Sequence, residues 1–265
     1  MNKAYYVILV SFFVFLSCKS THKNQEIVSE ELINILSPQE VQDGWKLLFD
    51  GKSFNGWQGV GKKEIQKDNW KIENGNIRKL NNEQVEILSG KQSLNGGDLM
   101  TIKTYNNYEL YFEWKLSKAG NSGVKYNVSE EISKMYGKKN YAVGFEYQLL
   151  DDADEKYAGK IEPSQFTASL YDLIPAVNGK TKQVGEYNSS KILVIGNHIE
   201  HWLNGQEVLT FELGSQKLDS LWQISKFNKT PNFLVKHSGH IVLQNHKDDA
   251  WFRNIKIREI HPKSE

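Results

Sequence analysis

The sequence predicts an all-β domain, a sandwich or jelly roll of antiparallel sheets. Short β-prone runs bounded by Gly, Asn, Asp and Ser recur along the chain, and long helical patterns are scarce. Aromatic residues make up 12% of the chain, which suits both a β-rich core and carbohydrate contact. Many short strands separated by turn signals are typical of sandwiches rather than of βαβ units.

The N-terminus has the features of a bacterial lipoprotein signal. Lys3 supplies a positive start, residues 4–16 are apolar, and Phe15-Leu16-Ser17-Cys18 resembles a lipobox. The apolar run is too short for a retained membrane-spanning helix. We expect residues 1–18 to be a signal peptide and Cys18, the only cysteine, to carry a lipid. This predicts a protein of the bacterial cell envelope, anchored to the membrane through lipid, in the periplasm or at the outer membrane.

The rest of the chain divides into two parts. Residues 19–42 are polar and are expected to form a tether, with room for a short helix around Glu30 to Leu36. Residues 43–262 have the length of a single all-β domain. The charge balance of 33 basic against 32 acidic residues leaves no field for nucleic acid and favours a neutral partner.

Strands in the first half of the domain are short, and two of them alternate clearly. The expected runs are Lys46–Phe49, Trp70–Glu73, Asn76–Leu80, Tyr108–Leu116, Gly123–Val128 and Gly144–Leu150. In the last run Phe145, Tyr147 and Leu149 face a core, while Glu146 and Gln148 face the other side. A carboxylate on a rigid strand among aromatics suits acid–base chemistry, because burial raises its pKa. A plain surface glutamate is the alternative.

Two later segments place polar side chains on strand faces. Asn204-Gly205 predicts a tight hairpin within residues 191–211, with His198, Glu200 and Trp202 on one face. Indole and carboxylate side chains together can stack and hydrogen-bond a sugar, although Trp202 also suits a core. In residues 239–260 the face shared by His240, Val242, Gln244 and His246 predicts a binding surface, with a solvated face as the alternative.

Taken together, these segments resemble the 3-keto-disaccharide hydrolase family. The motifs include FDGKSFNGW at 49–57, GNSGVKY at 120–126, GFEYQLLDD at 144–152, NHIEHWLNG at 197–205 and LQNH at 243–246. The resemblance spans essentially residues 43–260. It implies a concanavalin A-like lectin/glucanase jelly roll that cleaves glycosides already oxidised at C3, with a sugar 3-dehydrogenase as the pathway partner.

The resemblance also suggests roles for particular residues. Glu146 or His246 is the candidate base for the C2 proton, and Arg253, Gln244 and Gln148 are candidates to hold the C3 oxygen. The sugar contacts suggested by the same motifs are Asp151, Asn121, Asn188, His198, Glu200 and Trp202. Tyr187 stands where the family usually has Trp, and Asn245 and Lys247 depart from LQDHG, so substrate choice is open.

The alternative functions are a conventional glycosidase and a non-catalytic carbohydrate-binding lipoprotein. A conventional glycosidase needs two flanking carboxylates, and the strand with Glu146 offers an amide, Gln148, at the alternate position. A non-catalytic carbohydrate-binding lipoprotein would need stacking aromatics and amides but no base. The sequence establishes no cofactor; a divalent metal, calcium or another, held by loop oxygens stays open.

Overall fold

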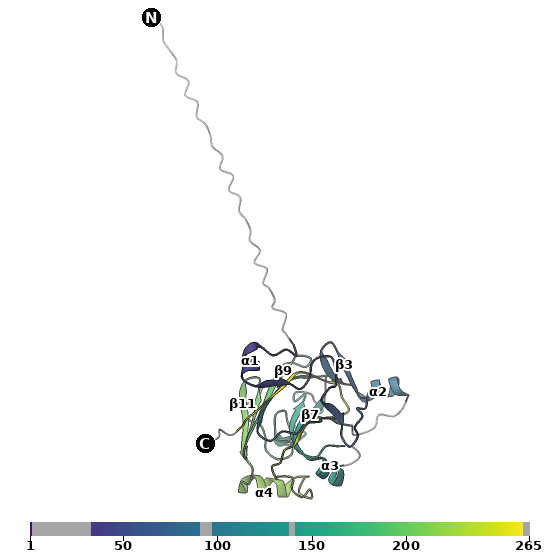
Figure 1. Cartoon of the computed structure of the whole chain (residues 1–265), viewed down its shortest axis with the longest axis vertical. Coiled ribbons are helices and arrows are strands. Elements are labelled where there is room, and N and C mark those ends of the chain that lie inside the picture. Colours follow the sequence, from purple (N-terminus) through teal and green to yellow (C-terminus); the bar gives the residue numbers. More distant parts are fainter. Residues whose placement is uncertain (2–32, 91–96, 138–140, 262–265) are drawn as a thin grey trace. The chain divides into compact units, whose positions relative to one another are not determined.

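The computed structural model describes residues 33–90, 97–137 and 141–261, together with Met1 (Figure 1). The predicted signal peptide with Cys18 and the proposed tether up to residue 32 lie outside the described residues. The expected helix around Glu30 to Leu36 is described only from residue 33, and residues 33–36 are not helical. The chain divides into Met1–Glu31 and Leu32–Glu265, and the second unit contains the whole domain. No helix in the described residues is long and apolar enough to cross a membrane.

The domain is a jelly-roll sandwich of two antiparallel sheets, as predicted. The larger sheet has eight strands in the order β11-β10-β9-β6-β13-β4-β3, and β1 pairs with β13. Its strands are β1 (Trp45–Leu47), β3 (Trp70–Glu73), β4 (Asn76–Lys79), β6 (Tyr108–Leu116), β9 (Asn188–Ile195), β10 (His198–Leu203), β11 (Gln206–Glu212) and β13 (Ala250–Glu259). All six expected early runs coincide with strands to within two residues at either end, and β1 is the expected run Lys46–Phe49 shifted toward the N-terminus.

The smaller sheet has five strands in the order β2-β5-β12-β7-β8. They are β2 (Trp57–Gly59), β5 (Leu99–Thr101), β12 (His240–Leu243), β7 (Asn121–Val128) and β8 (Phe145–Leu150). The three-residue strands β2 and β5 were not predicted, because runs so short carry no periodicity. This sheet positions the candidate site.

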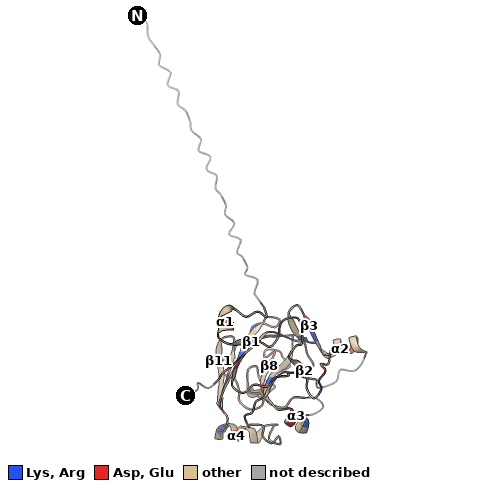
Figure 2. Ribbon diagram, viewed as in Figure 1, with Lys and Arg blue, Asp and Glu red and all other residues tan. Residues whose placement is uncertain are grey.

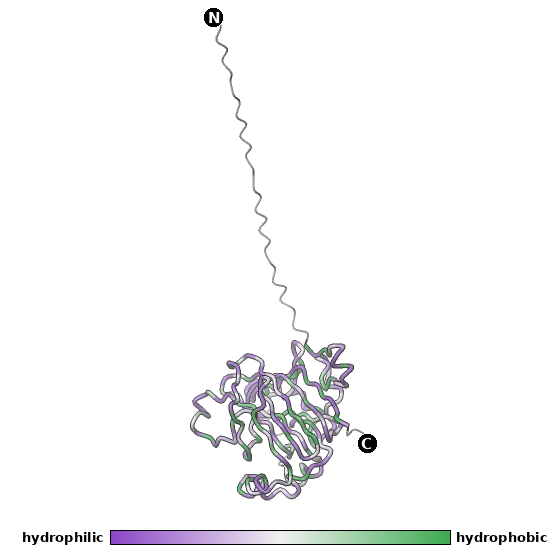
Figure 3. Tube along the Cα trace, turned by 90° about the vertical axis from the view of Figure 1, so that its left-hand side faces the viewer, coloured by the Kyte–Doolittle hydropathy of each residue, from purple (hydrophilic) through white to green (hydrophobic). Residues whose placement is uncertain are grey.

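The core lies between the two sheets. Alternate residues of β6 and β8 face each other across it, and the rings of Phe112 and Tyr147 meet edge to face at 5.6 Å between centroids. Along the trace of the domain, hydrophobic positions are interspersed with hydrophilic ones (Figure 3). Acidic and basic residues are scattered along the ribbon rather than gathered by sign, which fits the near-neutral net charge (Figure 2).

Short helices decorate the connections. They are α1 (Pro38–Gln42), α2 (Asn82–Ser89), α3 (Glu130–Tyr136), α4 (Gln216–Ile224) and a 3-10 turn at Pro163–Gln165. Each of the four α-helices begins with a Ser or Asn whose side chain accepts a backbone N–H of the first turn.

The segment before residue 43 belongs partly to the folded domain. Asn34 exchanges hydrogen bonds with Asn254 on β13. The backbone N–H of Asn34 donates to Asn254 Oδ1, and the backbone N–H of Asn254 donates to Asn34 Oδ1 at 2.9 Å. Glu40, on α1, is ion-paired with Lys256. The described end of the predicted tether is therefore packed onto the larger sheet, and the helix lies at Pro38–Gln42.

The hairpin predicted at Asn204-Gly205 is confirmed. It joins β10 to β11, and both turn residues have positive φ, 49° and 83°. This is the conformation of the type I′ turn that Asn-Gly favours.

Candidate functional site

Glu146 lies on the outer face of the smaller sheet, on its edge strand β8. Its strand, β8, sends Phe145, Tyr147 and Leu149 into the core, so Glu146 and Gln148 point to the opposite side. Glu146 is nevertheless only 7% exposed. The site is recessed rather than flat on the surface.

Two amide side chains hold the Glu146 carboxylate. Gln244 Nε2 donates to Glu146 Oε1 at 2.9 Å. With the Gln148 amide oriented to satisfy its neighbours, its nitrogen lies 3.1 Å from the same oxygen and 3.2 Å from the Ser122 carbonyl. No hydrogen bond within the described residues occupies Glu146 Oε2. One carboxylate oxygen is thus fixed, and the other is available to a ligand.

A glycine makes room for this carboxylate. Gly123 is on the neighbouring strand β7, and a Cβ built there would lie only 2.6 Å from Glu146 Oε1. Real Cβ contacts are essentially never so short, so a side chain at Gly123 would displace Glu146. The NSG motif of β7 therefore has a direct structural purpose.

Burial raises the pKa of Glu146. The charges of Lys125, Lys226 and His246 oppose this rise, and the carboxylate of Asp98 adds to it. The two candidate bases, Glu146 and His246, are therefore near enough to interact electrostatically. A buried carboxyl with a raised pKa and nearby cations is typical of an acid–base site.

Lys125 and Asp98 form a buried ion pair beside Glu146. Lys125 faces Glu146 in the β7–β8 register, and its Nζ lies 3.2 Å from Asp98 Oδ2. Asp98 also accepts the backbone N–H groups of Ala142 at 3.1 Å and Asn245 at 2.8 Å. Asp98 thereby anchors two loops of the site and has its oxygens engaged.

Three buried polar atoms in the same loop region have no hydrogen-bond partner among the described residues. They are Gln244 Oε1, His246 Nδ1 and Asp248 Oδ2. His246 Nδ1 lies 3.6 Å from Asp248 Oδ2, which is too long for a hydrogen bond. Because buried polar groups are nearly always paired, such a group of atoms indicates a position where a polar ligand or water binds.

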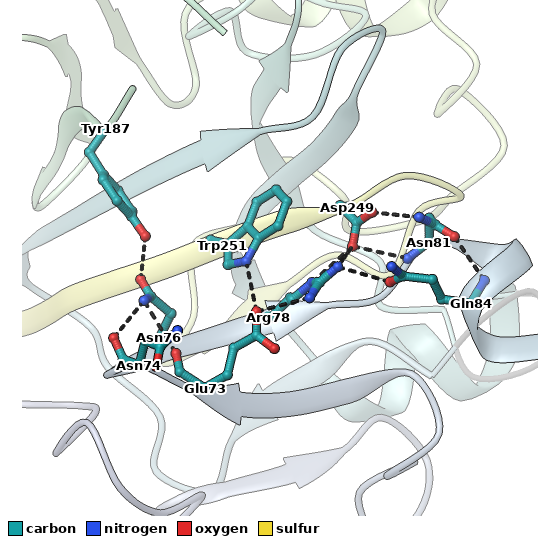
Figure 4. Close-up of polar contacts among 9 residues, drawn as sticks. All are labelled: Glu73, Asn74, Asn76, Arg78, Asn81, Gln84, Tyr187, Asp249 and Trp251. Atoms are coloured by element: carbon teal, nitrogen blue, oxygen red, sulfur yellow. Dashed lines mark hydrogen bonds and ion pairs between the residues drawn. The ribbon is translucent and has the colours of Figure 1, made fainter. Parts of the chain in front are cut away.

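The loop that carries these atoms is fixed at its far end. Asp249 accepts Arg78 Nε at 3.0 Å and Asn81 Nδ2 at 2.6 Å, and Arg78 also contacts Glu73 at 2.9 Å (Figure 4). This network ties the start of β13 to β3, β4 and the N-cap of α2. The segment between Gln244 and Asp249 is therefore held at both ends.

Lys226 and Tyr171 complete the site and were missed in the sequence. Lys226 Nζ lies 4.0 Å from the centre of the Tyr171 ring, and burial lowers its pKa while Glu146 and Asp172 oppose this. Burial, with the Glu146 charge, raises the pKa of Tyr171 to about 12. Both residues come from irregular loops, where no periodicity could have pointed to them.

The outer face of the larger sheet carries His198, Glu200 and Trp202. They share one face of β10, as predicted, but the core separates them from Glu146. His198 Nε2 lies 3.0 Å from Glu200 Oε1, and Trp202 Nε1 donates to Glu200 Oε2 at 2.7 Å. The structure therefore does not bring these three residues to the site. The two-residue period of a strand predicts which side chains share a face, but it does not predict which sheet the strand joins.

Arg253 is also on the larger sheet and not beside Glu146. Its Nε donates to Glu113 Oε2 at 2.7 Å, and its guanidinium lies 3.9 Å from the centre of the Tyr187 ring. The expected role of Arg253 at the C3 oxygen has no support from this position. Its neighbours explain it as a brace between β13 and β6.

The remaining predicted contacts separate into near and distant residues. Asn121 lies on β7 beside Gln148. Asp151 Oδ2 accepts Ala119 N at 2.9 Å and holds the turn before β7, while Asn188 Oδ1 accepts Lys182 N at 2.8 Å. Of the three, only Asn121 lies on the face that carries Glu146. The described residues contain no group of three or more His, Cys, Asp or Glu side chains that could hold a metal.

Comparison with known proteins identifies the family. Residues 44–258 match the model of the 3-keto-alpha-glucoside-1,2-lyase-like domain. The chain belongs to this family. A relative from Bacteroides thetaiotaomicron, named 3-keto-disaccharide hydrolase, is 38% identical over 233 residues, which cover 82% of this chain and 78% of the relative. Family and relative both support a glycoside-cleaving enzyme.

Solved structures of similar fold agree with the family. A crystal structure of a proposed glycosyl hydrolase from Parabacteroides distasonis is 28% identical, with a TM-score of 0.74, and covers 87% of this chain and all of that one. A second from the same organism is 25% identical, with a TM-score of 0.60, and covers 82% of this chain and 99% of that one. Both solved structures share the fold of this domain.

Proposed function

We propose that this enzyme cleaves glycosides whose C3 hydroxyl has been oxidised to a ketone. In this reaction a base removes the C2 proton, the group at C1 leaves, and water then adds to the resulting enone. The observation that carries the proposal is the single recessed carboxylate, Glu146, fixed by two amides and surrounded by cations. The name of the relative from Bacteroides thetaiotaomicron supports the same substrate class.

Glu146 suits the removal of a carbon-bound proton made acidic by the adjacent ketone. Its raised pKa makes it a stronger base than an exposed glutamate, and its Oε2 accepts no hydrogen bond from the residues that the structure describes. His246 is the second candidate base, since its Nδ1 has no hydrogen-bond partner among the described residues. The two side chains could divide proton removal at C2 and proton delivery to the leaving oxygen.

Lys226 is placed to stabilise the enolate that forms when the C2 proton leaves. No hydrogen bond or ion pair in the described structure holds its Nζ, which lies over the Tyr171 ring near Glu146. A prealigned cation in a recessed site stabilises developing negative charge most effectively. Gln148 and Gln244 supply the amide groups beside Glu146.

The surroundings of Asp98 argue against a conventional two-carboxylate glycosidase. Asp98 is the carboxylate whose charge acts on Glu146, but it is fully buried, ion-paired with Lys125 and bonded to two backbone N–H groups. A second catalytic carboxylate must reach the glycosidic bond or its water. Asp98 is committed to the fold instead.

Product formation from a 3-keto-disaccharide and from its unoxidised parent, measured in parallel, tests the proposal. We expect cleavage of the keto sugar only, and a loss of about 10²- to 10⁴-fold in kcat for Glu146→Gln. Glu207→Gln, an exposed glutamate on β11, is the matched control. Cleavage of the parent sugar would instead indicate a conventional glycosidase, and saturable binding without cleavage would indicate a carbohydrate-binding protein. Retained turnover in Glu146→Gln together with loss in His246→Gln would assign the base to His246.

A further inference from the structure

A cavity of about 250 Å³ lies between the loop after β2 and helix α3. Its walls include Val60, Gly61, Glu130, Ser133, Lys134 and Tyr141. None of these residues belongs to the Glu146 site described above. The volume is small for a drug-sized ligand pocket and suits a single ring.

Lys125 connects this cavity to the Glu146 site. It stands opposite Glu146 on the neighbouring strand, and adjacent strands are about 4.8 Å apart. The Nζ of the same lysine lies 5.9 Å from the centre of the Tyr141 ring. It is held in place by the ion pair with Asp98 and by a hydrogen bond to the Ala142 carbonyl at 3.0 Å. The cavity therefore begins within reach of the second ring of a disaccharide whose first ring is at Glu146.

The lining of the cavity offers an acceptor held in a fixed position. Glu130 Oε1 accepts Gln58 Nε2 at 3.3 Å and lies 3.8 Å from His240 Nε2, and Glu130 Oε2 lies 3.5 Å from Lys134 Nζ. The Glu130 side chain remains 40% exposed, so it can still accept hydrogen bonds from a ligand. Because Glu130 is ion-paired with Lys134, another wall residue, its charge is balanced, and the lining suits a neutral ligand.

Tyr141 supplies the other half of a sugar contact. An aromatic ring beside a hydrogen-bond acceptor can pack against the C–H groups of a sugar while its hydroxyls donate to the carboxylate. We infer that this cavity is the leaving-group subsite and that it binds a neutral, hydroxyl-bearing sugar ring. The inference rests on the proposed function, since it names the group expelled from C1.

Two substrates with the same oxidised ring separate the subsite from the chemistry. Full-length protein in detergent would be assayed on a 3-keto-disaccharide and on the methyl 3-keto-glycoside, which has almost nothing to place in the cavity. For Glu130→Gln we expect kcat/KM on the disaccharide to fall about tenfold or more, as for loss of a hydrogen bond to a charged group, with the methyl glycoside changed less than about twofold. Tyr141→Leu should give the same selective loss.

The matched control is Glu131→Gln, an exposed neighbour on α3. Loss only on the disaccharide in Glu130→Gln, with wild-type behaviour in the control, supports the inference. Equal losses on both substrates, or no loss on either, overturn it while the proposed function stands. A wild-type protein that cleaves neither keto sugar overturns the proposed function and the subsite with it.

Discussion

Glu146 has two kinds of neighbour with opposite effects on its proton. Burial favours the neutral carboxyl, whereas Lys125 and Lys226 favour the carboxylate. The balance keeps its pKa above the ordinary glutamate value. If Glu146 is the base, kcat/KM must fall as the pH drops through this raised pKa, because only the carboxylate can accept the C2 proton.

Removing one cation near Glu146 should shift the acidic limb of the pH profile, the range in which kcat/KM falls as the pH drops. In Lys226→Met the carboxylate loses a favourable charge, so the pKa of Glu146 rises further and the limb of the pH profile shifts to higher pH. Loss of the cation should also lower kcat at the plateau by about 10²-fold if Lys226 stabilises the enolate. The measurement is kcat/KM from pH 4 to 8, with Lys217→Met, exposed on α4, as the control. An unshifted limb with full plateau activity would exclude Lys226 from the site chemistry.

At this scale the sequence predicted some residues and could not predict others. The alternation of residues 144–151 placed Glu146 and Gln148 on one face, which is confirmed. The alternation of residues 240–246 placed Gln244 on a polar face, but its hydrogen bond to Glu146 was not predicted. Lys226 and Tyr171 lie in loops, and only the folded chain brings a loop residue to a strand residue distant in sequence. The pattern of a single sequence indicates the local period of a strand or helix, but it does not indicate which distant residues come into contact in the fold.

At the scale of elements, three adjacent strands of the smaller sheet build the site. β8 supplies Glu146, β7 supplies Lys125 and the space above Gly123, and β12 leads into Gln244. Sites on strands are held more firmly than sites on loops, which is useful where one oxygen must meet one proton.

Gly123→Ala tests how strictly the strand geometry is required. The new methyl group would lie 2.6 Å from Glu146 Oε1, so we expect the carboxylate to move and activity to fall by about 10²-fold, the effect of a misplacement near 1 Å. Gly123 does not have positive φ, so the backbone should tolerate alanine and the melting temperature should change little. Gly179→Ala, where a Cβ meets only ordinary contacts at 3.4 Å, is the control. Full activity in Gly123→Ala would show that Glu146 need not hold its observed position.

The sequence predicted the faces of the strands but not the sheet to which each strand belongs. Residues 198–203 were assigned correctly to strand faces, and Arg253 was expected at the C3 oxygen. Their strands belong to the larger sheet, so these side chains lie away from Glu146. Which sheet a strand joins depends on long-range pairing, here β10 with β9 and β13 with β6. Nothing within a ten-residue window encodes that choice.

For the whole molecule, His201 links the two sheets through the core. Its Nδ1–H donates to the Ala168 carbonyl at 2.8 Å, and its Nε2 accepts the Tyr126 hydroxyl at 2.7 Å. The ring belongs to β10 of the larger sheet, and Tyr126 belongs to β7 of the smaller one. Burial lowers the pKa of His201 to about 4, so the ring is neutral in the folded protein near pH 7.

This buried histidine predicts loss of stability in acid. The unfolded chain binds a proton at His201 near pH 6.5 and the folded chain only near pH 4, so protons favour unfolding across that interval. The full effect is about 3 kcal/mol, from a pKa difference of roughly 2.5 units. Urea unfolding at pH 7 and pH 4.5 measures it. His201→Gln should be less stable than wild type at pH 7 but should lose less on acidification.

The exposed His198 provides a control of opposite sign. Hydrogen bonds to Glu200 and Glu212 raise its pKa, so protonation of His198 favours the folded state and its contribution is lost as the pH rises. His198→Gln should therefore lose more stability than wild type between pH 7 and pH 4.5, whereas His201→Gln should lose less. Identical acid sensitivity in all three proteins would mean that carboxylates elsewhere control acid unfolding, and that the contact between the sheets at His201 tolerates a charge.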